Sequence, residues 1–163
     1  MQKETTIEIL DQYLLTGQAT LQEVTKCLAR HTVMPYLRHL ELTELAEGLP
    51  QDEAEATRRL LRLRLLFVDS YENDVLFEQL FGLRTLHLHL RAYTHNQISR
   101  RDLESRINST LSDFPLDAMV RQTLYDLRYT LAEDPEEVPR VDVANACFKT
   151  LRRLEALWFA VLK

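Results

Sequence analysis

Four basic side chains share one face of a helix that the sequence predicts over residues 74–95. They are Arg84, His87, Arg91 and His95. Spacings of three, four and four residues place them within about 80° of arc on a helix, and such a line of positive charge can bind an anionic ligand or an RNA phosphate. Leucine and phenylalanine cover much of the remaining circumference, and a helix that is apolar almost all round is usually buried. The line is therefore also compatible with a salt-bridged structural stripe or with a protein-binding face.

Within the same segment, Arg84 and His89 read R-x4-H. This motif resembles the Rx4-6H signature of the HEPN family, all-α domains that include many ribonucleases. The resemblance covers these six residues. It implies that Arg84 binds the scissile phosphate and that His89 is the acid/base group, in a cleft formed by a dimer.

The chain carries no other catalytic template. The sequence has no G-x-S-x-G, P-loop, G-x-G-x-x-G or H-E-x-x-H motif, and Cys27 and Cys147 are too far apart to form a local metal-binding pair. With three glycines in the chain, a backbone loop that cradles phosphate is hard to build. We therefore expect no metal site and no cofactor.

Two acidic clusters form a second candidate surface. Its members are Asp52, Glu53, Glu55, Glu136 and Glu137. An end of the molecule with charge of one sign can steer a basic partner, although acids at a helix N-terminus also simply stabilise the helix. The chain has a net charge of −5, which makes nucleic acid an unlikely general partner, because phosphate binding depends on basic residues.

Capping residues, glycines and prolines divide the chain into about eight predicted helices. Their ranges are 4–16, 21–31, 35–48, 52–68, 74–95, 99–112, 115–132 and 140–162. Thr5 with Glu8 and Thr20 with Glu23 have the spacing of capping boxes, and Gly17 is placed to end the first helix in a left-handed conformation. Gly82 lies inside the fifth helix, where glycine costs about 1 kcal/mol relative to alanine, so it predicts close packing or a bend.

The two halves of the chain look similar, which predicts an internal duplication of about 4–70 and 74–163. The matched pairs are Leu10 and Leu90, Tyr13 and Tyr93, Thr20 and Ser99, Glu23 and Asp102, Val24 and Leu103, and Leu28 and Ile107. The two segments align when the second half is one residue shorter than the first between the matched tyrosine and the matched capping residue. Shared caps and leucine spacing between any two helical hairpins would explain the same pairs without duplication.

The amino-acid composition predicts an all-α fold class. Apolar residues make up 45% of the chain, with three glycines and five prolines, too few for the turns of a β-sandwich or barrel. We expect a single all-α domain, 1–163, built as a helical bundle or as two stacked four-helix repeats, with Cys27 and Cys147 reduced in the core. Trp158, Phe159 and Val161 are also predicted core residues; exposure of any of them would indicate a dimer or partner interface.

The first residues show no signal peptide, and no apolar run is long enough to cross a membrane, so a cytoplasmic location is expected. Our leading hypothesis is a non-enzymatic interaction module, an adaptor, inhibitor or immunity-type antitoxin that binds another, basic protein. A HEPN-like ribonuclease or inactive relative and an anion-binding regulatory bundle are the alternatives. A homodimer is compatible with all three.

Overall fold

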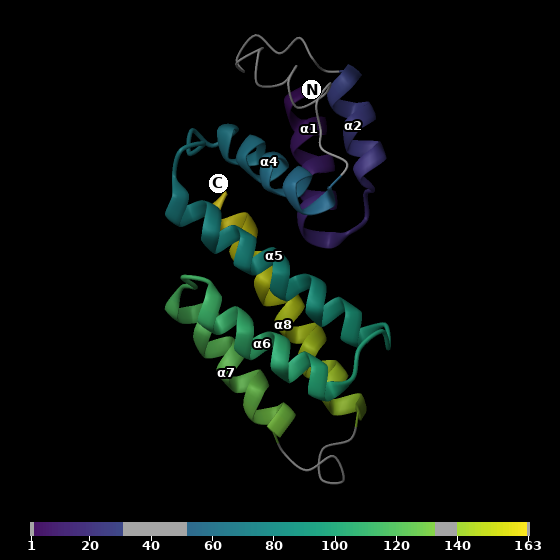
Figure 1. Ribbon diagram of the computed structural model, residues 1–163, viewed down its shortest axis with the longest axis vertical. Coiled ribbons are helices and arrows are strands. Elements are labelled where there is room, and N and C mark those ends of the chain that lie inside the picture. The colour runs from purple at the N-terminus through teal and green to yellow at the C-terminus, as the bar shows by residue number, and fades with distance from the viewer. Residues whose placement is uncertain (1, 31–51, 133–139, 163) are drawn as a thin grey trace. The chain divides into compact units, whose positions relative to one another are not determined.

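The computed structural model describes residues 2–30, 52–132 and 140–162, and this part of the chain is all α-helical (Figure 1). It contains seven α-helices and one π-helical turn, against about eight predicted. The elements are α1 (Gln2–Asp11), η1 (Gln12–Thr16), α2 (Leu21–Arg30), α4 (Glu53–Leu66), α5 (Asp74–Thr94), α6 (Arg100–Asp113), α7 (Ala118–Ala132) and α8 (Arg140–Val161). The helix predicted over 35–48 lies outside the described residues.

The chain divides into two compact units, Met1–Phe77 and Glu78–Lys163, and the boundary falls near the start of α5. In the N-terminal unit, α1 packs against α2 and α4. A buried ion pair joins two of these helices: Arg64 Nε lies 2.8 Å from Asp11 Oδ1, and Arg64 Nη2 lies 3.3 Å from Asp11 Oδ2. In the same unit, the Tyr13 and Thr57 hydroxyls are 3.0 Å apart.

Most helix ends follow the predicted signals, with one correction. Gly17 ends the first helical segment with φ 70°, and Thr20 and Glu23 form the reciprocal capping bonds expected of a capping box. The prediction for Thr5 and Glu8 was wrong, because α1 already begins at Gln2 and both residues lie inside it. A threonine can begin a helix only if the residues before it are not themselves helical.

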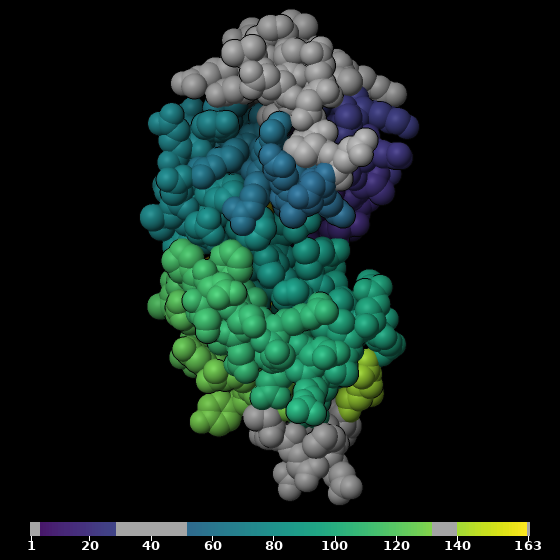
Figure 2. Space-filling view, viewed as in Figure 1, coloured from purple at the N-terminus to yellow at the C-terminus, as the bar shows by residue number. Residues whose placement is uncertain are grey.

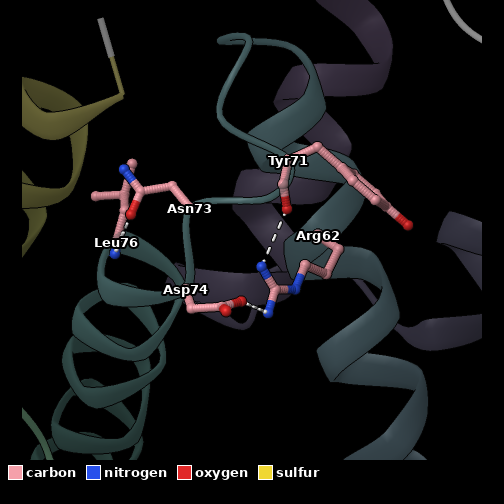
Figure 3. A network of polar contacts seen from close by, with 5 residues as sticks. All are labelled: Arg62, Tyr71, Asn73, Asp74 and Leu76. Carbon is pink, nitrogen blue, oxygen red and sulfur yellow. Dashed lines mark hydrogen bonds and ion pairs between the residues drawn. The ribbon is translucent and has the colours of Figure 1, made fainter.

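Arg62 holds the loop between α4 and α5 in place (Figure 3). Its guanidinium donates to the Tyr71 carbonyl (3.0 Å) and to Asp74 Oδ1 (2.6 Å), and it stacks over the Phe77 ring, 4.1 Å from the centroid. Asn73 Oδ1 accepts a hydrogen bond from the Leu76 amide (3.0 Å) and so caps α5. The interruption between the helices predicted over 52–68 and 74–95 is confirmed, and this network explains its shape.

In the C-terminal unit, α6 packs against α7 and α7 against α8, around a core that includes Trp158, which is fully buried. Arginines secure the helix ends here. Arg100 donates to the Thr130 and Leu131 carbonyls at the end of α7, both at 2.9 Å. Arg121 donates to three carbonyls around the end of α6. Such bonds satisfy carbonyls that a helix leaves without intrahelical partners.

Gly82 lies where α5 meets the segment that follows α6. A Cβ atom at this position would come within 2.9 Å of Leu116 Cδ2 and 3.0 Å of Phe114 Cβ, closer than packed atoms tolerate. The expectation of close packing at Gly82 is therefore confirmed, and it explains why a residue unfavourable in helices occupies the middle of α5.

The core predictions for α8 were right for one residue and wrong for two. Trp158 is buried, but Phe159 is 46% exposed and Val161 is 41% exposed. A run of apolar residues at the end of a helix cannot all face one core, because successive residues turn by 100°. Cys27 and Cys147 form no disulfide and are buried as predicted, and burial raises the pKa of the Cys147 thiol to about 12.

The residues matched between the two halves occupy similar environments. Leu10 and Leu90, Val24 and Leu103, and Leu28 and Ile107 are all fully buried. Ser99 and Asp102 form a capping box, as Thr20 and Glu23 do. Just before these boxes, Gly17 and Asn96 both have positive φ, 70° and 59°. These likenesses support the duplication, which remains a prediction.

Candidate functional site

The line of basic residues on α5 contributes to a polar cluster between α5 and α8. His87 Nε2 lies 2.9 Å from Glu155 Oε1, and Arg91 Nε donates to His87 Nδ1 over 2.8 Å. His87 is only 2% exposed, Arg84 and Arg91 are half-buried, and His95 at the end of the line is exposed. We call Arg84, His87, Arg91 and Glu155 the α5–α8 cluster.

The contacts of His87 define its protonation state. An arginine Nε–H can only donate, so His87 Nδ1 must be an acceptor and cannot carry a proton. The ring proton therefore lies on Nε2, which donates to Glu155. In this state the imidazole is neutral. It accepts a hydrogen bond from the Arg91 guanidinium and donates one to the Glu155 carboxylate of α8.

Burial and charge favour this neutral state. Burial lowers the pKa of His87 below its ordinary value of 6.5; the hydrogen bond to Glu155 opposes this effect, and the charge of Arg91 adds to it. Burial also lowers the pKa of Arg91, and the nearby charge of Arg84 lowers it further. The contacts with Arg91 and Glu155, together with burial, hold His87 in its neutral form, which supports a structural interpretation of this part of the line.

The R-x4-H pair lies on the helix α5. Five positions along a regular helix separate two side chains by about 140°. His89 Nδ1 lies 3.3 Å from Arg106 Nη1 of α6, and burial, followed by the charge of Arg106, lowers the pKa of His89. Arg84 instead lies within electrostatic range of Arg91. The paired roles of Arg84 and His89 that the HEPN resemblance implies stay a prediction, and a regular helix turns the two side chains away from each other.

Three of the five candidate carboxylates lie within the described residues, at the start of α4. Asp52, Glu53 and Glu55 are exposed. Asp52 is the N-cap, since its Oδ1 accepts from the Ala54 amide over 3.1 Å, and Glu55 pairs with Arg59 four residues on, at 3.4 Å. These two carboxylates have local structural roles. Glu136 and Glu137 lie outside the described residues.

Sequence reasoning did not single out the outer side of α7. Its exposed members are Met119, Gln122, Tyr125, Asp126 and Tyr129, which we call the α7 face. Met119 is 67% exposed and Tyr129 is 76% exposed. Figure 2 shows side chains of α7, in light green, at the surface of the C-terminal unit. The signal that could have found this face is the pair of tyrosines spaced by four residues, which share one side of a helix.

Comparison with known proteins finds no matching family model, no matching curated protein and no matching solved structure. Within the described ranges, no group of three or more His, Cys, Asp or Glu side chains is arranged to hold a metal ion. None of the described helices is both long and apolar enough to cross a membrane.

Proposed function

We propose that this protein acts by binding another protein through its C-terminal unit, as an adaptor, an inhibitor or an immunity-type antitoxin, and not by catalysis. The observation that carries the proposal is the α7 face. Tyrosine and methionine are enriched in protein interfaces, and a group of large apolar side chains left in water usually marks an interaction site. A cytoplasmic location belongs to the same proposal, and two buried cysteines that form no disulfide are compatible with it.

The chemistry of the α7 face indicates what kind of partner it fits. Asp126 lies among the apolar side chains and accepts a hydrogen bond from Gln122, 3.0 Å away. Arg128 lies over the Tyr125 ring, 4.9 Å from its centroid, and also donates to Asn108 of α6. The aromatic ring is therefore held in position before any partner arrives, and preorganised side chains lose less entropy on binding. A partner with basic groups among apolar ones would complement this face and the net charge of −5.

Site-specific photo-crosslinking in the source cells tests the proposal. A photoreactive amino acid at Gln122 should yield one dominant crosslinked product, and the same amino acid at Ser105, an exposed position on α6, serves as the matched control. The double substitution Met119→Ser with Tyr129→Ser should reduce the Gln122 product at least tenfold while the far-UV circular dichroism spectrum stays unchanged. Equal products from Gln122 and Ser105, or none from either, would overturn the proposal.

The geometry favours this function over the ribonuclease alternative, and a direct assay separates them. Because a regular helix separates the His89 and Arg84 side chains by about 140°, we expect purified protein and its His89→Ala variant to show the same background RNA cleavage. Cleavage that is abolished by His89→Ala would instead establish the HEPN-like activity.

A further inference from the structure

One side of α8 carries exposed apolar and charged side chains, and Glu155 at the edge of this side also contacts His87 of α5. They recur at alternating spacings of four and three residues: Val141, Asn145, Phe148, Arg152, Glu155 and Phe159. We call this set the α8 seam. Val141 is 67% exposed, and Phe148 and Phe159 are each 46% exposed. Alternating spacings of four and three keep residues in line along a helix and are the pattern by which two helices pair.

The apolar residues of the α8 seam are self-complementary. Consider two antiparallel copies of α8 related by a two-fold axis that passes between residues 153 and 154. Phe148 of one copy then faces Phe159 of the other, and the reverse pair forms on the far side of the axis. In a two-fold interface every contact occurs twice in this way, and two aromatic pairs in contact are favourable beyond the area that they bury.

The charged residues pair about the same axis. Arg152 of one copy faces Glu155 of the other, and again the contact occurs twice. Arg152 is exposed, and Glu155 bonds His87 through Oε1, which leaves Oε2 for a second donor. A single axis therefore matches aromatic with aromatic and cation with anion, whereas a shift of one turn would place Phe148 beside Glu155.

We propose that the α8 seam binds a second copy of this chain as an antiparallel helix pair about this two-fold axis. Charge complementarity identifies the occupant, because the cation and the anion of the seam are placed to satisfy each other in a second copy. The contact has four layers, the two aromatic pairs outside and the two ion pairs inside. It extends over about 16 Å of helix, and so short a seam predicts a weak dimer with a dissociation constant in the micromolar range, on the order of 10–100 μM.

Sedimentation equilibrium tests the charge pairing. Replacement of Arg152 by glutamate, R152E, places two glutamates opposite each other at both ion pairs, and we expect the dissociation constant to rise at least tenfold. Arg153→Glu is the matched control: it makes the same change in net charge at the next residue, which is also exposed but turned by about 100° away from the seam. It should leave dimerisation within about twofold of the original protein.

Two results of this experiment would overturn the proposal. The original protein could remain monomeric at concentrations of about 500 μM, well above the expected dissociation constant. Alternatively, R152E and Arg153→Glu could weaken the dimer equally, which would show that net charge and not the seam controls association. Far-UV circular dichroism verifies that each variant is folded.

Disulfide formation tests the register independently of stability. A Phe148→Cys chain mixed with a Phe159→Cys chain should form a crosslinked dimer under mild oxidation, because the two positions face each other. Either chain alone should not, because equivalent residues lie about 16 Å apart along the axis and a disulfide needs Cα atoms within about 7 Å. The native Cys147 is buried with its pKa raised to about 12, so its thiol will not compete. Equal crosslinking of the single chains would contradict the register.

Discussion

At the scale of single residues, several arginine side chains form the contacts that connect helices and loops. Arg62 closes the loop before α5, Arg100 and Arg121 donate to carbonyls at helix ends, and Arg64 forms a buried pair with Asp11. A planar guanidinium with five donors can satisfy several carbonyls from one position. The abundance of arginine over lysine in this chain therefore has a structural reason, and it does not by itself indicate an anion-binding function.

The Asp11–Arg64 pair shows the energetic consequence of burying an arginine. The side chain of Arg64 is 5% exposed and that of Asp11 is 11% exposed, and Arg64 Nη1 is buried without a hydrogen-bond partner among the described residues. Removing one partner of a buried ion pair typically costs about 3–5 kcal/mol, because the other charge is left uncompensated. The pair therefore constrains how α1 and α4 fit together within the N-terminal unit.

His87 should make the stability of the protein depend on pH. Its pKa is lowered in the folded state, so between that pKa and the ordinary 6.5 the unfolded chain binds the proton more readily. The stabilising contribution is thus fully present above pH 6.5 and is lost as the pH falls through the folded pKa. Protonation would also place a new N–H against the Arg91 N–H that now donates to Nδ1.

Urea unfolding between pH 8 and pH 5.5 measures this effect. We expect the free energy of unfolding of the original protein to fall over this range, and His87→Gln to flatten the fall, since glutamine can replace the neutral ring without titrating. His95→Gln removes an exposed histidine that lies just after the end of α5, and it is the control. Identical slopes for the original protein and His87→Gln would show that His87 does not titrate in this way.

At the scale of elements, the π-helical turn η1 has a specific explanation in the proposed duplication. Tyr13 and Gly17 are four residues apart, whereas the corresponding Tyr93 and Asn96 are three apart. The second half passes this point without a π-helical turn, and the first half has η1 there, with the Gly17 amide bonded to the Gln12 carbonyl. A π-helical turn accommodates one extra residue within a helix, so the extra residue and the local geometry agree.

Deletion of Thr16 tests this explanation. Without the extra residue, the turn should become regular α-helix, and the N-terminal unit should stay folded with a loss of at most about 2 kcal/mol, the size of an ordinary single substitution. Deletion of Arg59, an exposed residue in the middle of α4, is the control, because it turns the rest of α4 by about 100° and moves Leu60 and Leu61 out of the core. Hydrogen exchange of the α1 and α4 amides reports both outcomes. If both deletions remove amide protection to the same extent, the interpretation of the extra residue as an insertion is wrong.

Element boundaries were largely predictable because their signals are local. Thr20 with Glu23, Gly17 and Asp52 each act on backbone groups within a few residues, and the structure shows each of them in that role. The extra residue was visible in the sequence, but a π-helical turn could not be inferred from it, because a loop can absorb one residue equally well.

The candidate site was harder to predict because its contacts are long-range. Helical spacing correctly placed Arg84, His87 and Arg91 on one side of α5, but nothing near them in sequence identifies Glu155 as their partner 68 positions later. The exposure of Phe159 and Val161 likewise depends on how α8 is packed and not on their own composition. Periodicity predicts which residues share a face, and only the packed structure shows what that face meets.

At the scale of the whole molecule, the chain divides into two compact units, and the single domain expected from the composition stays a prediction. Each unit has its own buried core, with Leu14, Leu28 and Leu60 among the fully buried residues of the first and Leu86, Ile107 and Trp158 among those of the second. A unit of about 90 residues with its own core is large enough to fold alone. Trp158 is the chain's single tryptophan, so its fluorescence reports on the C-terminal unit alone.

We therefore expect a fragment that spans residues 74–163 to fold on its own. It contains all of α5, α6, α7 and α8, and it retains both the His87–Glu155 contact and the close packing at Gly82. Its Trp158 emission should match that of the full chain and should change in one cooperative transition with urea, at a similar midpoint. A fragment of residues 100–163 lacks α5 and should not fold, because Glu155 and the apolar faces of α6 and α8 lose their partners. An unfolded 74–163 fragment, or a 100–163 fragment with the same cooperative transition, would show that the C-terminal unit is not the independent structure that its core indicates.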